Sequence, residues 1–243
     1  MQLSLTHSLL AIELAFPLAL ALRADWLAPA RGTMVPVYVY LAWLIVYAIA
    51  TSIFGARGVY VSDDMLATLP GLWLQLVTVA AVVAPVILIP GVWRGLRTIV
   101  DATPLHWFAW LHGLRIAALG TAYKTAIGEF PAYFEYLVGI PDLLFGLSAF
   151  WIAAKLKRGE IGDTGFMFWN LLGAAIIVPS APILLQLGLP GPLQLFTSLP
   201  DARAVFTYPM SIAPMIGVPL FVLTNLWVAW PLWEKGREQV AIS

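Results

Sequence analysis

Seven stretches of this chain are long and apolar enough to be membrane-spanning helices. A helix needs about 20 mostly apolar residues to cross a hydrocarbon core of about 30 Å. The stretches cover residues 7–22, 34–54, 71–93, 105–122, 132–154, 166–187 and 213–233. A helix satisfies its own backbone hydrogen bonds, which a segment inside lipid must do. The sequence therefore predicts an all-α fold, a polytopic membrane helix bundle of about seven transmembrane helices, in a single domain over residues 1–243.

Composition agrees with a membrane protein and excludes several functions. Charged residues make up 11% of the chain, against about 25% in an ordinary soluble domain. The formal net charge is zero and no basic face is present, so nucleic acid is excluded as a partner and the lipid bilayer is expected as one. The chain has no cysteine, which excludes thiolate metal sites and covalent haem attachment.

The distribution of lysine and arginine predicts the orientation of the helices. With seven spans, alternate loops lie on one side, and nine basic residues fall on one side against three on the other. The nine are Arg23, Arg31, Arg94, Arg97, Lys155, Lys157, Arg158, Lys235 and Arg237; the three are Arg57, Lys124 and Arg203. Cytoplasmic loops carry the basic excess. We therefore expect the N-terminus outside, the C-terminus in the cytoplasm, and a first helix that is retained.

Two oppositely charged residues lie near the centre of adjacent predicted spans. At a rise of about 1.5 Å per residue, Arg115 and Asp142 are each about 15 Å from a membrane boundary. His112 lies about one helical turn from Arg115 on the same face. An unpaired charge at this depth costs about 3 kcal/mol. The sequence thus predicts a polar centre between the fourth and fifth spans, beside a helix break at Pro141.

A second charged group lies where the chain turns between these two spans. It contains Lys124, Glu129 and Glu135. A solvated rim is one interpretation, and a vestibule leading to Asp142 is the other. Both groups together are the candidates for ligand binding or proton relay.

Several familiar sites are missing from the sequence. There is no nucleotide-binding, metalloprotease or hydrolase motif, and no metal site is expected. The seventh span has no lysine, so a retinal Schiff base is not expected there. His106 and His112 are six residues apart, which places them on different helical faces. The sequence thus favours a non-enzymatic function and specifies no cofactor.

One segment resembles part of a known group of proteins. Residues 112–149 are similar to a segment that recurs in uncharacterised bacterial multi-pass integral membrane proteins. The matching positions are Arg115, Gly128, Pro131, Phe134, Gly139, Asp142 and Gly146. The resemblance implies that Arg115 and Asp142 belong to a common pattern, and it implies no activity. The excess of arginine over lysine and the abundance of Ala, Gly and Pro are typical of a GC-rich bacterial genome, so we expect a multi-pass protein of the bacterial inner (cytoplasmic) membrane.

Two functional hypotheses follow. In the first, the protein binds or moves a small solute or a proton through the polar centre, as a transporter does. In the alternative, it is a non-catalytic membrane subunit or scaffold of a larger complex with membrane protein partners. Arg115 and Asp142 would then be a structural clamp between two helices.

Overall fold

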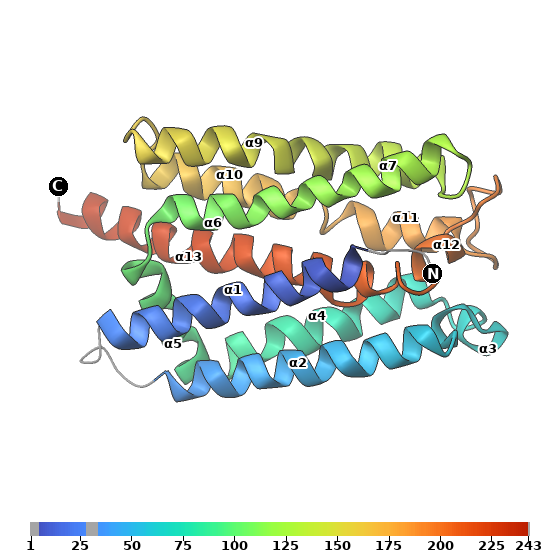
Figure 1. Ribbon diagram of the computed structural model, residues 1–243, viewed down its shortest axis with the longest axis horizontal. Helices are drawn as coiled ribbons and strands as arrows, with labels where there is room; N and C mark the ends of the chain where they lie inside the picture. Colours follow the sequence, from blue (N-terminus) through green and yellow to red (C-terminus); the bar gives the residue numbers. More distant parts are fainter. Residues whose placement is uncertain (1–4, 28–33, 243) are drawn as a thin grey trace.

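Every regular element in the described part of the chain is helical. The computed structural model describes residues 5–27 and 34–242, and no strand occurs in these ranges. Six helical stretches are long and apolar enough to cross a membrane: Thr6–Leu27, Val35–Ala56, Pro70–Leu88, Ala132–Lys157, Asp163–Gly188 and Ala213–Glu238. Figure 1 shows an elongated bundle with the long helices running along it. The predicted all-α fold is confirmed, and the apolar helices fit a multi-pass membrane protein.

Three of these stretches are single helices and three are built from shorter segments. The single helices are α1 (Thr6–Leu27), α2 (Val35–Ala56) and α4 (Pro70–Leu88). The composite stretches are α8 (Ala132–Phe134), η4 (Glu135–Gly139) and α9 (Ile140–Lys157); α10 (Asp163–Ala175) and α11 (Ser180–Gly188); and η5 (Ala213–Gly217) and α13 (Val218–Ile242). The short elements η2 (Val59–Val61), α3 (Asp63–Leu66) and α12 (Arg203–Phe206) lie outside them.

The fourth predicted span is a helical rod of three parts. These are α6 (Leu105–His112), the 3₁₀-helical segment η3 (Gly113–Ala118) and α7 (Leu119–Ala126). The rod runs along the bundle beside α9, which both α6 and η3 contact (Figure 1). It is not among the six apolar stretches, and it carries the polar residues His112, Arg115 and Lys124. The rod with the weakest membrane-helix composition is therefore the one that carries the polar centre.

The third predicted span, residues 71–93, is divided in the structure. α4 ends at Leu88, and Pro90 begins a separate helix, α5 (Pro90–Ala102). The predicted loop between spans 71–93 and 105–122 is therefore wrong, because most of it is helical. A proline cannot donate a backbone hydrogen bond and fits the first turn of a helix, so Pro90 ends one helix and starts the next.

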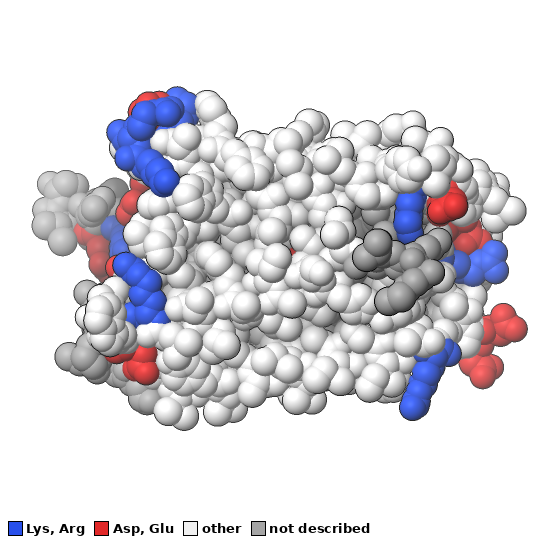
Figure 2. All heavy atoms as spheres, in the orientation of Figure 1, with Lys and Arg blue, Asp and Glu red and all other residues white. Residues whose placement is uncertain are grey.

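α5 closes one end of the bundle. Its apolar face is buried through Val92, Leu96 and Ile99, and it contacts α1, α2 and α13. Two ion pairs attach it to the last part of α13: Arg97 to Glu234 at 2.8 Å, and Lys235 to Asp101 at 2.7 Å. Figure 2 shows charged side chains gathered at the two ends of the molecule, with an almost uncharged surface between them. Arg31, which the orientation prediction included, lies outside the described residues.

In the described residues, two turns of π-helix lie at or near the start of a long helical stretch. Each is followed two residues later by a proline: η4 by Pro141 and η5 by Pro219. A proline ring crowds the carbonyl four residues earlier and leaves it without a helical donor. A wider turn moves that carbonyl away from the ring, which explains the paired positions. Such turns occur often at functional sites.

A tryptophan and a tyrosine of α2 bind backbone carbonyls of α4. Trp43 Nε1 donates to the carbonyl of Ala81 at 2.8 Å, and the Tyr40 hydroxyl donates to that of Val82 at 2.6 Å. Pro85 lies inside α4, four residues after Ala81, and has no N–H to offer it. The Trp43 indole therefore replaces the hydrogen bond that Pro85 removes, and it joins α2 to α4.

Candidate functional site

Arg115 is a fully buried charged residue inside the bundle. It lies on η3 and its side chain has no exposed surface. The guanidinium carbon is 4.7 Å from the ring centre of Phe145 on α9 and 5.0 Å from that of Phe221 on α13. A Cβ atom at Gly146 would come within 2.9 Å of the Arg115 Cβ, so glycine there allows η3 to lie against α9. Two aromatic faces thus stabilise the cation while shielding it.

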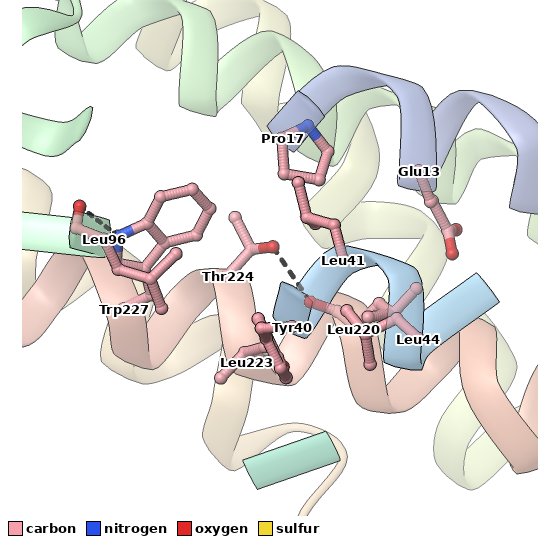
Figure 3. A pocket seen from close by; sticks show the side chains of 10 residues that line it. All are labelled: Glu13, Pro17, Tyr40, Leu41, Leu44, Leu96, Leu220, Leu223, Thr224 and Trp227. Atoms are coloured by element: carbon pink, nitrogen blue, oxygen red, sulfur yellow. Dashed lines mark hydrogen bonds between the residues drawn. The ribbon is translucent and has the colours of Figure 1, made fainter. Parts of the chain in front are cut away.

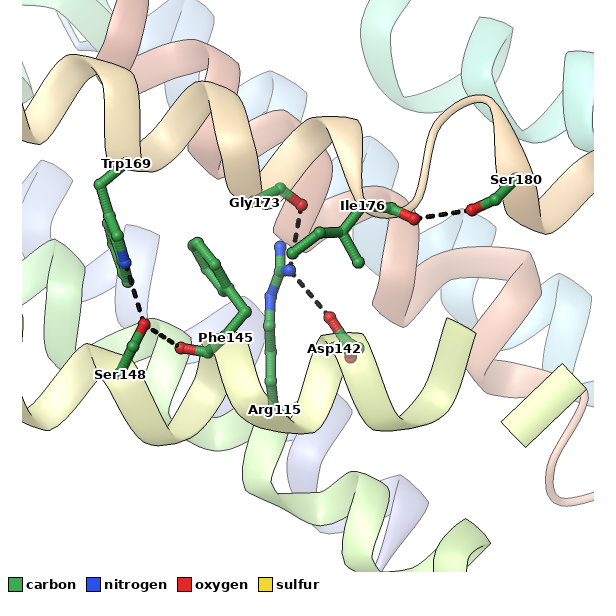
Figure 4. A network of polar contacts seen from close by, with 8 residues as sticks. All are labelled: Arg115, Asp142, Phe145, Ser148, Trp169, Gly173, Ile176 and Ser180. Atoms are coloured by element: carbon green, nitrogen blue, oxygen red, sulfur yellow. Dashed lines mark hydrogen bonds and ion pairs between the residues drawn. The ribbon is translucent and has the colours of Figure 1, made fainter. Parts of the chain in front are cut away.

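Hydrogen bonds hold the Arg115 guanidinium from three helices. Nη1 donates to Asp142 Oδ1 on α9 at 2.8 Å and to the carbonyl of Gly173 on α10 at 3.2 Å (Figure 4). Asn225 of α13 supplies the third contact when its amide is oriented to match its neighbours. Its oxygen then accepts from Nη2 at 2.7 Å. The predicted pairing of Arg115 with Asp142 is therefore present in the geometry, as part of a larger network.

His112 belongs to the same network. In the matching orientation, the Asn225 nitrogen donates to His112 Nε2 at 3.0 Å and to Asn170 Oδ1 at 3.2 Å. A neutral imidazole that accepts at Nε2 carries its proton on Nδ1. That nitrogen has no hydrogen-bond partner and the ring is fully buried. Phe145, Trp169 and Phe221 surround the ring, with centroids 5.5 to 5.9 Å away.

The α8–η4–α9 stretch carries two acids, Asp142 and Glu135, which differ in their partners and burial. Asp142 pairs with Arg115, and its side chain retains 16% exposure. Glu135, on η4, is 1% exposed and neither of its carboxylate oxygens has a hydrogen-bond partner. Its carboxylate lies over Gly139, where a Cβ would come within 2.3 Å of Oε2. The Thr121 hydroxyl lies near this carboxylate and donates to the carbonyl of Ala118 at 2.8 Å.

The remaining two candidates lie apart from the centre. Lys124 is half-buried near the end of α7, and Glu129 is exposed in the turn that follows. Neither takes part in an ion pair among the described residues. The structure therefore brings His112, Arg115 and Asp142 together, places Glu135 along the same helix, and leaves Lys124 and Glu129 at the rim.

Three further polar residues lie at or near the centre and were not among the predicted site residues. Asn170 and Asn225 are both fully buried, on α10 and α13, so the centre involves four helical stretches rather than two. Glu13 of α1 is 7% exposed and lies within electrostatic range of Arg115 and Asp142. The available signal was a polar side chain inside an otherwise apolar span, which is costly unless it is paired or functional.

Comparison with protein families assigns the chain to one family. The family model for a domain of unknown function, DUF8737, matches residues 71–233, about two thirds of the chain. The chain belongs to this family. The region matched to DUF8737 contains the whole Arg115 network and the segment 112–149, but it begins after α1 and Glu13. No curated protein and no solved structure matches the chain significantly.

Proposed function

We propose that this DUF8737 member is a bacterial inner-membrane protein that binds or moves a proton through its polar centre. Its topology would be seven spans, with the N-terminus outside and the C-terminus in the cytoplasm. The six apolar helices support this topology, and the rod α6–η3–α7 supplies the remaining span. Burial of an intramembrane ionisable group supports the function, because such groups line ion and proton pathways.

Glu135 is the observation that carries the proposal. A clamp between two helices needs one ion pair, and Arg115 with Asp142 already supplies it. Glu135 adds a second carboxylate two helical turns from Asp142, fully buried and without a hydrogen-bond partner. Such a group stabilises nothing when it is ionised. Accepting and releasing a proton would give Glu135 a role.

A proton suits the centre better than an organic solute does. Phe145 and Phe221 cover the Arg115 guanidinium, and Asp142, Gly173 and Asn225 occupy its donors. An organic anion would have to displace these groups in order to reach the charge. A proton needs only a carboxylate and a hydrogen-bonded route.

Proton flux into liposomes tests this proposal. The purified protein is reconstituted with a pH-sensitive dye inside the vesicles, and a potassium diffusion potential drives proton entry. We expect Glu135→Gln and Asp142→Asn each to lower the flux at least tenfold. Glu129→Gln, which neutralises an exposed acid of the same hairpin, should leave the flux unchanged. Flux in wild-type vesicles no faster than in protein-free vesicles would overturn the proposal.

The clamp remains the second candidate, and the saturation of Arg115 favours it. Helices α9, α10 and α13 each contribute a contact to the guanidinium, as a structural ion pair would require. In this alternative the protein is a non-catalytic subunit whose partners are other membrane proteins.

A further inference from the structure

Three basic residues lie at the end of α9, and one of them has no acidic partner. Lys155 and Arg158 both pair with Glu160. Lys157 forms no ion pair with the side chains that the structure describes. Figure 2 shows basic side chains gathered at the end of the molecule where Figure 1 places the end of α9. Lys157 therefore keeps a positive charge that an anion can bind.

A tryptophan and a histidine of α6 lie beside Lys157. Its Nζ atom is 4.1 Å from the centre of the Trp110 ring. His106 lies one helical turn before Trp110, with the two ring centroids 5.6 Å apart, and it is within electrostatic range of Lys157. The indole stabilises one side of the ammonium, which leaves N–H donors on the other side for a ligand. A ring nitrogen of His106 supplies a further donor.

An apolar seam between α9 and the rod α6–η3–α7 continues from these donors. Phe150 and Leu147 precede Lys157 by seven and ten residues, which places them on the same side of α9. Their side chains are 52% and 46% exposed, and that of Trp110 is 48% exposed. The Phe150 ring lies against Gly113 of η3, where a Cβ would come within 2.8 Å of it. At about 1.5 Å per residue, this apolar surface begins about 10 Å along the helix from the ammonium.

The cavity shown in Figure 3 has room for little more than one water. It is enclosed by α1, α2, α5 and α13, and its volume is about 20 Å³. A buried water needs about 10–15 Å³. A larger ligand would therefore bind at the surface of the bundle, where the seam lies.

We propose that Lys157, His106 and Trp110 bind the phosphate of an anionic phospholipid whose acyl chain lies along Phe150 and Leu147. The phosphate oxygens accept hydrogen bonds from the Lys157 ammonium and the His106 ring. Basic residues at the ends of membrane helices attract anionic headgroups. A phospholipid suits the site better than a free phosphate ion, because the acyl chain also covers the apolar seam. Lipid binding here is independent of proton binding at the polar centre, since none of these side chains is the proton carrier proposed above.

Because the chain has no cysteine, a single fluorescent label can report on the seam. The label is attached at Leu147→Cys, and the full chain is reconstituted in vesicles that contain lipids with brominated acyl chains, which quench the label on contact. We expect brominated phosphatidylglycerol to quench it with about fivefold higher apparent affinity than brominated phosphatidylcholine, because one basic residue near a membrane surface contributes about 1 kcal/mol. Lys157→Gln should remove this preference, and Lys157→Arg, which keeps the charge, should retain it.

Two controls show whether the preference is specific to the seam. Val79, on α4, has a similar exposure of 49%, and a label at Val79→Cys should show no preference that depends on Lys157. Lys124, at the other end of the rod, also forms no ion pair with the described side chains. Lys124→Gln should leave the preference at Leu147→Cys unchanged.

Four results would overturn the proposal. Equal quenching of the Leu147→Cys label by the two lipids would show that the seam binds hydrocarbon alone. A preference that survives Lys157→Gln would remove the cation from the site. A preference abolished by inorganic phosphate, but not by sodium chloride at the same ionic strength, would assign the donors to a free phosphate ion.

The fourth result is the absence of quenching by either lipid, which would show that no acyl chain lies along the seam. A disulfide-linked dimer of the unlabelled Leu147→Cys chain would then assign the seam to a second copy of the protein. None of these measurements depends on proton flux, so their result is separate from that of the proposed function.

Discussion

Arg115 and Asp142 form an ion pair whose two charges depend on each other. Removing one partner leaves the other charge buried and uncompensated. Arg115→Gln and Asp142→Asn should each destabilise the protein by about 3 kcal/mol, and the double variant should recover part of the loss. Thermal unfolding in detergent measures the stability of the wild type, the two single variants and the double variant. Strictly additive losses would show that the two side chains do not interact.

The same variants separate the two functional candidates. If the double variant recovers both stability and cellular phenotype, the pair is a clamp. If stability returns while the phenotype stays lost, the pair belongs to a site. Glu129→Gln again serves as the control, because that side chain is exposed at the hairpin turn.

Some of the residues that form the polar centre could be predicted from the sequence. Depth in the membrane follows from position along a helix, so the convergence of His112, Arg115 and Asp142 could be anticipated. The contributions of Asn170 and Asn225 could not, because they depend on which helices pack against the α6–α9 pair. That choice is made by long-range packing, and spacing along one helix does not reveal it.

The helices themselves were easier to locate than their interruptions. Apolar length indicated most of the long stretches, but the 71–93 pattern continued through Pro90 and hid the boundary between α4 and α5. The helical spacing of the apolar residues Val92, Leu96 and Ile99 was the signal in the sequence for α5. The π turns have no such pattern, since a proline can produce either a kink or a wider turn.

The hydrogen bond between α2 and α4 can be tested by mutation. Trp43→Phe removes the donor to the Ala81 carbonyl, which Pro85 already deprives of its helical partner. We expect a loss of about 1 kcal/mol in unfolding free energy, measured by thermal unfolding in detergent. The loss should be smaller in a Pro85→Ala background, where residue 85 gains an N–H. Trp26→Phe is the control, because Trp26 is 82% exposed. Equal losses in both backgrounds would refute the explanation.

The surface of the molecule seen in Figure 2 has an almost uncharged middle band between two charged ends. The basic excess of the sequence falls at the end closed by α5, where Arg97 and Lys235 form ion pairs. Reporter fusions after Ala102 and Glu160 should therefore report the cytoplasm, and a fusion after Gly58 should report the outside. A cytoplasmic signal from the Gly58 fusion would contradict the seven-span topology.

The 3₁₀ geometry of η3 also relates the protein to the thickness of its membrane. Its six residues rise about 2.0 Å each, against about 1.5 Å in an α-helix, which lengthens the rod by about 3 Å. Each residue turns about 120° rather than about 100°, so a return to α geometry would rotate α7 by about 120° relative to α6. A change in the length of η3 is therefore coupled to a rotation. A thinner bilayer that favoured the shorter α-helical form of η3 would also rotate α7 relative to α6.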